Sequence, residues 1–328
     1  RASARFIWML RASWCVVVLH LLTSTAMATT TTTTNGHATR GTTNGIMNGT
    51  PEEDSCKTKE QKPKTMVVAL DLDGTLLNRE HQVSEASRRK LHELCALECV
   101  VAIASGRSGP AMYEIVERLG LPSSETFAVA YNGAAGFRFA RGFSAVSREP
   151  KSVLFERCHE PRCVDAVLEF ARRDGLLAQC YVGDDIFVCC VHPEHREFTR
   201  RYTALTGCTH TYLDDAYASV PRDRVLKILV MTDDPDGVHA SLVAHLKDAQ
   251  VPANVVRGSP PFFVEILNPT VTKGAGLSLL CDHLGVDLDR VVAFGDGDND
   301  VEFLQAAGLG VAMHNARPVT KRVANRVT

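Results

Sequence analysis

The fold class of this chain is decided by the stretch Val67-Val68-Ala69-Leu70-Asp71-Leu72-Asp73-Gly74-Thr75-Leu76-Leu77. A short apolar run with β-branched residues is typical of a buried strand. It ends in Asp71 and Asp73, and residues two positions apart on an extended backbone point to the same side. Gly74 then permits a sharp turn. The stretch therefore predicts two carboxylates at the carboxyl end of a strand, where open α/β sheets place their ligands.

Two carboxylates at one point repel each other unless a cation or a shared proton separates them. Asp71 and Asp73 are therefore a candidate metal and acid–base site. The alternative is that Asp73-Gly74 is only the turn of a hairpin. Polar side chains at the ends of later strands favour the metal and acid–base site over the hairpin turn.

Bulk composition indicates a soluble globular protein. The 328 residues suffice for two domains, and 45% hydrophobic and 23% charged residues are ordinary proportions. The net charge of -2 gives no field that would recruit nucleic acid or an anionic membrane. The 11 cysteines contain no CxxC pair, which favours reduced thiols in a reducing compartment. Residues 189–195 hold Cys and His, but Pro193 and the spacing fit no closed zinc site, so we expect no zinc there.

Residues 1–64 differ from the remainder, since no Asp or Glu precedes Glu52. The apolar run 14–22 has the layout of a signal or transit peptide, but it is short and contains His20, so we expect no stable membrane span. The chain begins with Arg, which makes a gene-model artefact a third alternative, and all three stay open. Residues 29–64 predict a disordered linker. We expect an intracellular location, the cytosol or an organelle such as a plastid or mitochondrion, with secretion as the open alternative.

From residue 65 onward, strand and helix patterns alternate. Residues 65–145 contain the strands 66–71, 100–104 and 127–130 with helices between them, which predicts a doubly wound parallel sheet of Rossmann-like type. The rhythm changes over 146–257, and we expect an inserted α+β domain there. Residues 258–328 resume the first rhythm with strands 262–266 and 291–294 and a helix 273–284. The sequence predicts no oligomeric state.

Polar side chains follow several of these strands: Asp71 and Asp73, Ser105, Asn132, and the segment 296–300. Parallel strands deliver their carboxyl ends to one edge of a sheet, so these groups should converge, and Lys273 at a helix start can reach the same edge. Carboxylate oxygens suit Mg²⁺, while a hydroxyl and an ammonium suit a phosphate.

Four segments resemble, in order and strand context, the motifs of the haloacid dehalogenase-like phosphatases: Asp71-Leu72-Asp73-Gly74-Thr75, Ser105, Lys273, and Gly295-Asp296-Gly297-Asp298-Asn299-Asp300. Four further details are similar to the Cof-type subgroup: Ser105-Gly106-Arg107, Asn132-Gly133-Ala134, Val264-Glu265-Ile266 and Gly310-Val311-Ala312-Met313. In that subgroup a cap domain is inserted between the second and third motifs, where the rhythm changes here. The family core usually continues beyond a segment like 324–328, so we expect the C-terminal end to be truncated.

The resemblance implies a role for the acidic residues. Asp71 would be the nucleophile that forms an aspartyl-phosphate, and Asp73 would be the acid and base. Asp71, Asp73 through its backbone carbonyl, and Asp296 would bind Mg²⁺. Asp300 would support the metal waters or Lys273.

The resemblance also implies the phosphate and substrate contacts, which would come from Ser105, Gly106, Asn132, Lys273 and Asn299. A strand-end turn explains Asn132 nearly as well, and Arg107 is interpreted as structural. A calcium loop at 296–300 is excluded, because its sixth position is Val301 rather than Gly and its twelfth is Ala307 rather than Glu.

These observations predict a Mg²⁺-dependent phosphatase of small phosphorylated metabolites, with the cap closing over the site. One alternative is a sugar-phosphate mutase of the same fold. A second alternative is a catalytically idle ligand sensor or interaction protein, against which the intact charged motif residues argue.

Overall fold

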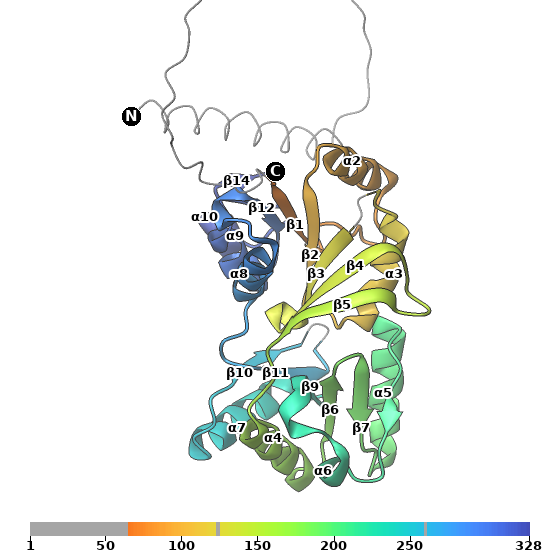
Figure 1. The fold of residues 1–328 in the computed structure, drawn as a ribbon. Helices are drawn as coiled ribbons and strands as arrows, with labels where there is room; N and C mark the ends of the chain where they lie inside the picture. Colours follow the sequence, from red (N-terminus) through yellow and green to blue (C-terminus); the bar gives the residue numbers. More distant parts are fainter. Residues whose placement is uncertain (1–64, 123–124, 259–260) are drawn as a thin grey trace, which may run out of the picture.

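The structure is a computed structural model, and it describes residues 65–328 apart from 123–124 and 259–260. The predicted leader and linker in residues 1–64 lie outside the described residues. Figure 1 shows two units, one above the other, each built on its own sheet. None of the helices in the described part of the chain has the length and apolar character needed to cross a membrane.

The upper unit is built on an eight-stranded sheet with the order β14-β13-β12-β1-β2-β3-β4-β5. The parallel part comprises β1 (Val67–Asp71), β2 (Val100–Ala104), β3 (Glu125–Ala130), β12 (Val291–Gly295), β13 (Leu309–Ala312) and β14 (Arg326–Val327). Two strands extend it antiparallel, β4 (Ala135–Ser144) and β5 (Glu149–Glu156). We call this unit the core, and β1 lies inside it between β12 and β2.

Helices cover both faces of the core sheet, because consecutive residues of its central strands are apolar and point to opposite faces. On one face Val68 and Leu70 pack with α2 (Glu85–Ala96) and α3 (Pro110–Leu119). On the other face Val67 and Ala69 pack with α8 (Lys273–Leu284) and α9 (Val301–Ala306), and the short α10 (Pro318–Val323) follows β13. Side chains that alternate across a strand serve two cores in this way. The predicted doubly wound α/β fold is confirmed.

The lower unit, residues 161–267, is built on a six-stranded sheet with the order β10-β11-β9-β6-β7-β8. We call it the cap. Its strands are β6 (Leu177–Val182), β7 (Asp185–Val188), β8 (Thr211–Tyr212), β9 (Val225–Met231), β10 (Asn254–Arg257) and β11 (Phe263–Leu267). Its helices are α4 (Pro161–Arg173), α5 (Pro193–Thr206), α6 (Ala216–Ser219) and α7 (Pro235–Asp248).

The two faces of the cap sheet have different neighbours. Helices α4 and α7 cover one face through residues such as Phe170 and Leu242. The other face carries Tyr181, Leu229 and Phe263, which belong to the same apolar cluster as the core residues of α3. The cap therefore lies with this face toward the core.

Two predicted boundaries are wrong. The strand predicted at 262–266 was expected in the core, but the observed strand β11 pairs with β9 and β10 of the cap, for example through Val264 and Val230. Residues 149–156 were expected in the inserted domain, but β5 pairs with β4 of the core. The connections between the units are therefore residues 157–160 and 268–272.

Candidate active site

The predicted polar residues meet at one edge of the core sheet. Asp71 ends β1, Ser105 follows β2, Asn132 follows β3 and Asp296 follows β12. These strands are adjacent and parallel, so their carboxyl ends point the same way. All nine predicted site residues line a single cleft of about 880 Å³ between core and cap: Asp71, Asp73, Ser105, Gly106, Asn132, Lys273, Asp296, Asn299 and Asp300. The cleft has the size of an ordinary small-molecule site.

The deepest part of the cleft is a buried ion-pair centre. Lys273 is the first residue of α8, whose N-cap Thr272 accepts a bond from Ala275 N–H. Its Nζ donates to Asp71 Oδ1 at 2.5 Å and to Asp300 Oδ1 at 2.8 Å. Burial alone would lower the pKa of Lys273, but the charges of the two carboxylates outweigh it and raise that pKa. The ammonium therefore stays charged and holds Asp71 in place.

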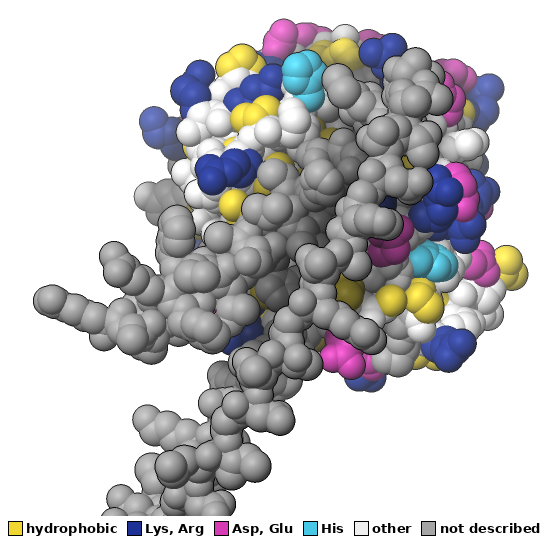
Figure 2. Space-filling model, turned by 90° about the horizontal axis from the view of Figure 1, so that it is seen from above, with side chains coloured by type: hydrophobic (Ala, Val, Ile, Leu, Met, Phe, Trp, Pro, Cys, Tyr) yellow, Lys and Arg dark blue, Asp and Glu magenta, His cyan; other side chains and the backbone are white. Residues whose placement is uncertain are grey.

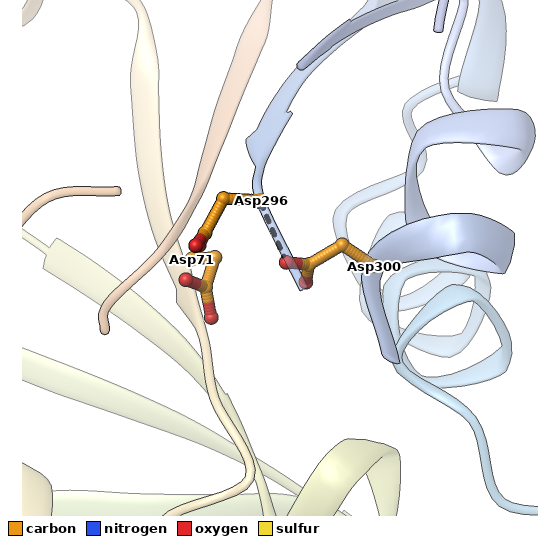
Figure 3. Close-up of side chains that lie close together, drawn as sticks. All are labelled: Asp71, Asp296 and Asp300. Atoms are coloured by element: carbon orange, nitrogen blue, oxygen red, sulfur yellow. Dashed lines mark hydrogen bonds between the residues drawn. The ribbon is translucent and has the colours of Figure 1, made fainter. Parts of the chain in front are cut away.

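Asp71 itself is 4% exposed. Burial raises the pKa of Asp71 to about 7, although Lys273 opposes the shift, and the charges of Asp300 and Asp296 add to it. Figure 3 shows these three carboxylates facing one another from β1 and from the segment after β12. One oxygen from each lies within 4.8 Å of the others.

Asp296 is held by residues outside the predicted set. Thr75 Oγ1 donates to its Oδ1 at 3.0 Å, and Asn315 Nδ2 donates to its Oδ2 at 3.2 Å. Gly74 passes so close that a Cβ there would lie 2.3 Å from Asp296 Oδ2, and its φ is +86°. Glycine is therefore required at this turn, which explains the Gly after Asp73.

Asp300 lies in the acidic cluster, but both of its oxygens are already bound. Oδ1 accepts from Lys273, while Oδ2 accepts from the backbone N–H groups of Asp296 and Gly297, both at 2.9 Å. The dashed line in Figure 3 marks the bond between Asp296 and Asp300. These bonds fix the loop after β12 and the lysine together. The arrangement fits the predicted supporting position of Asp300.

The donor set fits a hard divalent cation. The carboxylates of Asp71 and Asp296 offer oxygen ligands, which Mg²⁺ prefers. A cation among these carboxylates would also favour the ionised form of Asp71, whose pKa is raised in this structure.

Asp73 points away from this cluster. Its carboxylate accepts from Arg107 Nε at 2.8 Å and from Arg107 Nη2 at 2.6 Å, and His81 Nδ1 lies 3.3 Å from Oδ1. Burial would raise the pKa of Asp73, but the hydrogen bonds and charge of Arg107 lower it overall. The sequence reading of Arg107 as merely structural missed this contact with a predicted catalytic residue.

Ser105, Gly106, Asn132 and Asn299 form the wall beside Asp71. Ser105 Oγ accepts from the Arg107 N–H at 3.2 Å, and Asn299 Nδ2 donates to Asn132 Oδ1 at 2.9 Å. A Cβ on Gly106 would lie 2.9 Å from Asn132 Oδ1, so glycine lets the asparagine approach. The predicted binding residues are therefore neighbours in space.

The cap contributes a buried ion pair that the sequence analysis did not identify. Lys227 of β9 lies 2.7 Å from Glu265 of β11, and its Nζ also donates to the Gly106 carbonyl at 3.2 Å. Glu265 accepts from Asn132 Nδ2 at 3.4 Å. The sequence signal for this ion pair is Lys227, a charged residue inside the otherwise apolar strand Val225–Met231.

The Cys and His residues at 189–195 form no metal centre in the described structure. His195 uses both ring nitrogens, Nε2 with the Gly175 carbonyl at 3.0 Å and Nδ1 with the Val191 N–H at 3.3 Å. Cys189 Sγ donates to the Asp214 carbonyl. The nine cysteines of the described chain are free thiols.

Charge on the surface is mixed. On the described part of the face shown in Figure 2, Lys and Arg side chains are interspersed with Asp and Glu. This face therefore presents no field of one sign, in agreement with the net charge of -2.

Residues 68–328 match the profile of the haloacid dehalogenase-like hydrolases, so the chain belongs to this family of enzymes. It is 31% identical over 266 residues to a chloroplastic endoribonuclease YBEY of Arabidopsis thaliana, with 80% of this chain and 44% of that protein covered. The chain thus spans less than half the length of that relative. It is 30% identical over 263 residues to a phosphoglycolate phosphatase of Methanopyrus kandleri, covering 80% of this chain and 90% of that protein.

A third relative is the 5-amino-6-(5-phospho-D-ribitylamino)uracil phosphatase YitU of Bacillus subtilis, 29% identical over 284 residues and covering 81% and 92% of the two chains. Among solved structures, a haloacid dehalogenase-like hydrolase of Bacteroides thetaiotaomicron has a TM-score of 0.67 at 26% identity, covering 80% of this chain and 93% of that one. A protein of Thermotoga maritima has a TM-score of 0.66 at 26% identity, covering 80% and 91%. The family resemblance found in the motifs is confirmed.

Proposed function

We propose that the protein is a Mg²⁺-dependent phosphatase that hydrolyses small phosphomonoesters through an aspartyl-phosphate on Asp71. The observation that carries this proposal is the buried centre in which Lys273 bridges Asp71 and Asp300 beside Asp296. A structural ion pair needs one carboxylate, whereas this centre keeps three at the floor of a cleft. Concentrating repelling charges at a cleft is typical of a catalytic site.

The chemistry follows from the position of each group. The Asp71 oxygen that Lys273 does not hold attacks phosphorus, and the bond from phosphorus to the leaving oxygen breaks. Asp73 takes up a proton once Arg107 has left its carboxylate, and it gives that proton to the leaving oxygen. A water then attacks the aspartyl-phosphate, Asp73 accepts its proton, and Asp71 is released with inorganic phosphate. Arg107 occupies both carboxylate oxygens of Asp73 in this structure. The hydrogen bonds between Arg107 and Asp73 must therefore break before Asp73 can contact the leaving oxygen of the substrate.

The substrate phosphate binds to residues in the wall of the cleft. The Ser105 hydroxyl, the Gly106 N–H and the Asn299 amide offer neutral donors, and Lys273 offers the positive charge. Asn132 holds Asn299 in place through their amide contact. Donors that are fixed before the substrate arrives stabilise charge that develops on the phosphoryl group.

Mg²⁺ would be held by Asp71, Asp296 and the backbone carbonyl of Asp73, with Asp300 fixing Lys273 and the adjacent loop. When bound, the ion supplies positive charge that offsets repulsion between the phosphate and the carboxylates.

The substrate class is a small phosphorylated metabolite. The relatives of similar length are named as phosphatases of different compounds, including phosphoglycolate and a ribitylaminouracil phosphate. These relatives support the hydrolysis of a phosphate ester, but they do not identify the substrate of this protein. We place the selection of the leaving group in the cap, whose Lys227 and Glu265 line the cleft.

We further propose an intracellular location in a reducing compartment, such as a plastid. The free thiols of the described chain and the chloroplastic name of the Arabidopsis relative support it. A fluorescent fusion of the full-length gene product tests it, and secretion of the fusion would contradict it.

The decisive experiment is Asp71→Asn, which keeps the shape and the contact with Lys273 but removes the nucleophile. We expect phosphate release from a panel of phosphorylated metabolites to fall below about one thousandth of the wild-type rate. The matched control is Asp298→Asn, which removes an exposed carboxylate of the same cleft that is paired with Arg317. Hydrolysis by Asp71→Asn within tenfold of wild type would remove Asp71 from this role. Turnover that requires an added sugar bisphosphate would identify a mutase, and a wild type without turnover would favour the sensor.

A further inference from the structure

The tip of one cap hairpin touches the core. Strands β6 and β7 are joined by the two-residue turn Gly183-Asp184, since Val182 pairs with Asp185. Gly183 has a φ of +56°, which glycine adopts without strain. Its carbonyl accepts a hydrogen bond from Tyr131 Oη of the core at 2.8 Å. The turn therefore presents Asp184 to the core in a fixed position.

The Asp184 carboxylate is surrounded by donors from the core. Tyr113 Oη donates to Oδ1 at 2.5 Å, Lys151 Nζ donates to Oδ2 at 2.6 Å, and Arg148 Nη1 lies 3.6 Å from Oδ2. Lys151 Nζ also donates to Tyr113 Oη at 2.6 Å. The side chains of Lys151 and Asp184 are 11% and 20% exposed, so water screens this pair less than a surface pair. We call these four residues the clasp.

The clasp joins the cap to the elements that carry the site. Tyr113 lies on α3, which begins directly after the Ser105–Gly109 loop, and Tyr131, which holds the turn, directly precedes Asn132. The covalent connections are elsewhere in the cap: β11, which leads into 268–272, is separated from β7 by β9 and β6. In Figure 1 these connections run to the left of the cap, while β6 and β7 lie further right. The cap is thus held by its connections at one place and by the clasp at another.

We propose that Asp184 is a positioning residue that holds the cap closed over the active site, and that the clasp must open to admit substrate. An ion pair between two units that move apart is broken by the motion, so it biases the equilibrium toward the closed form. Closure brings Lys227 and Glu265 against Gly106 and Asn132. The proposal rests on the proposed function only for its kinetic test.

The chain carries its own reporter of opening. Cys208 of the cap is 6% exposed, and its Sγ lies 3.6 Å from Ser108 Oγ of the core. Opening the cap exposes this thiol. Cys180 lies inside the cap beneath α4 and α7, and Cys281 lies inside the core, each 1% exposed. These two thiols become accessible only when their own unit unfolds.

The test is Asp184→Asn in the full chain, with N-ethylmaleimide labelling followed for each cysteine by mass spectrometry. We expect the labelling rate of Cys208 to rise about tenfold, while the rates at Cys180 and Cys281 stay unchanged. The control is Asp233→Asn, whose partner Arg201 lies 2.7 Å away within the cap, and it should leave Cys208 unchanged.

The kinetic arm uses any phosphorylated metabolite that the wild type hydrolyses. Loss of the clasp weakens binding of substrate and transition state alike, so KM should rise about tenfold with kcat within about threefold. Unchanged Cys208 labelling in Asp184→Asn, or a parallel rise at all three cysteines, would overturn the proposal. A wild type without phosphatase activity would defeat the proposed function and leave the labelling result standing.

Discussion

Replacing Lys273 by methionine measures how strongly the site depends on its buried cation. The side chain of Lys273 is 1% exposed, and those of its partners Asp71 and Asp300 are 6% and 1% exposed. Methionine has a similar length but no charge, so two carboxylates would be left buried without a counterion. Removing one partner of a buried ion pair costs about 3–5 kcal/mol. For domains of this size each kcal/mol lowers Tm by about 2–4 °C.

We therefore expect Lys273→Met to lower Tm by roughly 10 °C, measured by far-ultraviolet circular dichroism at pH 7.5 with a chelator present. Adding Asp300→Asn removes one of the two stranded charges, so the double variant should melt several degrees above Lys273→Met. The control is Lys90→Met, which breaks an exposed pair with Glu93 and should change stability by less than about 1 kcal/mol. A Tm for Lys273→Met within about 2 °C of wild type, or a double variant less stable than the single one, would refute this electrostatic reasoning.

Two further predictions concern the metal and the pH dependence of stability. Asp296→Ala should raise the Mg²⁺ concentration for half-maximal phosphate release more than about tenfold, whereas Asp298→Asn should not; equal requirements in both variants would contradict the metal assignment. Burial lowers the pKa of His159 to about 4, whereas the ordinary value in the unfolded chain is near 6.5. Between these two values the unfolded chain binds a proton that the folded protein does not, so the folded protein loses stability as the pH falls from 6.5 toward 4. At pH 5 the loss is about 2 kcal/mol, and the Tm advantage of wild type over His159→Gln should shrink accordingly between pH 7.5 and 5; a constant advantage would contradict it.

The core and the site were predictable because their signals are local. Strands β1, β2 and β12 are continuous apolar runs, and a functional group comes at the residue where each run stops, namely Asp71, Ser105 and Asp296. Convergence then follows from parallel pairing alone. The Lys273 contact with Asp71 spans 202 positions of sequence and was still foreseen, since a helix start and a strand end lie at the same edge.

The errors concern pairing between distant segments. Phe263–Leu267 has the composition of a buried strand in either sheet, and only its register with Val225–Met231 assigns it to the cap. The extension by β4 and β5 was missed for the same reason, although Phe137 and Phe139 alternate with the exposed Arg138. The contact between Arg107 and Asp73 was also missed, because residue spacing in the sequence does not show in which direction a long side chain points.

The insertion of the cap between the two halves of the core also fixes the order in which the protein can be completed during translation. Strand β1 pairs with β2 soon after both emerge, but its other neighbour β12 begins only at Val291. At about 5–20 residues per second the ribosome needs on the order of 10–45 s to deliver it. Throughout that interval β1 presents an open edge, which is a site for mispairing with other chains. The whole cap is synthesised during this interval, so the nascent chain carries a complete cap while the core sheet still lacks β12, β13 and β14.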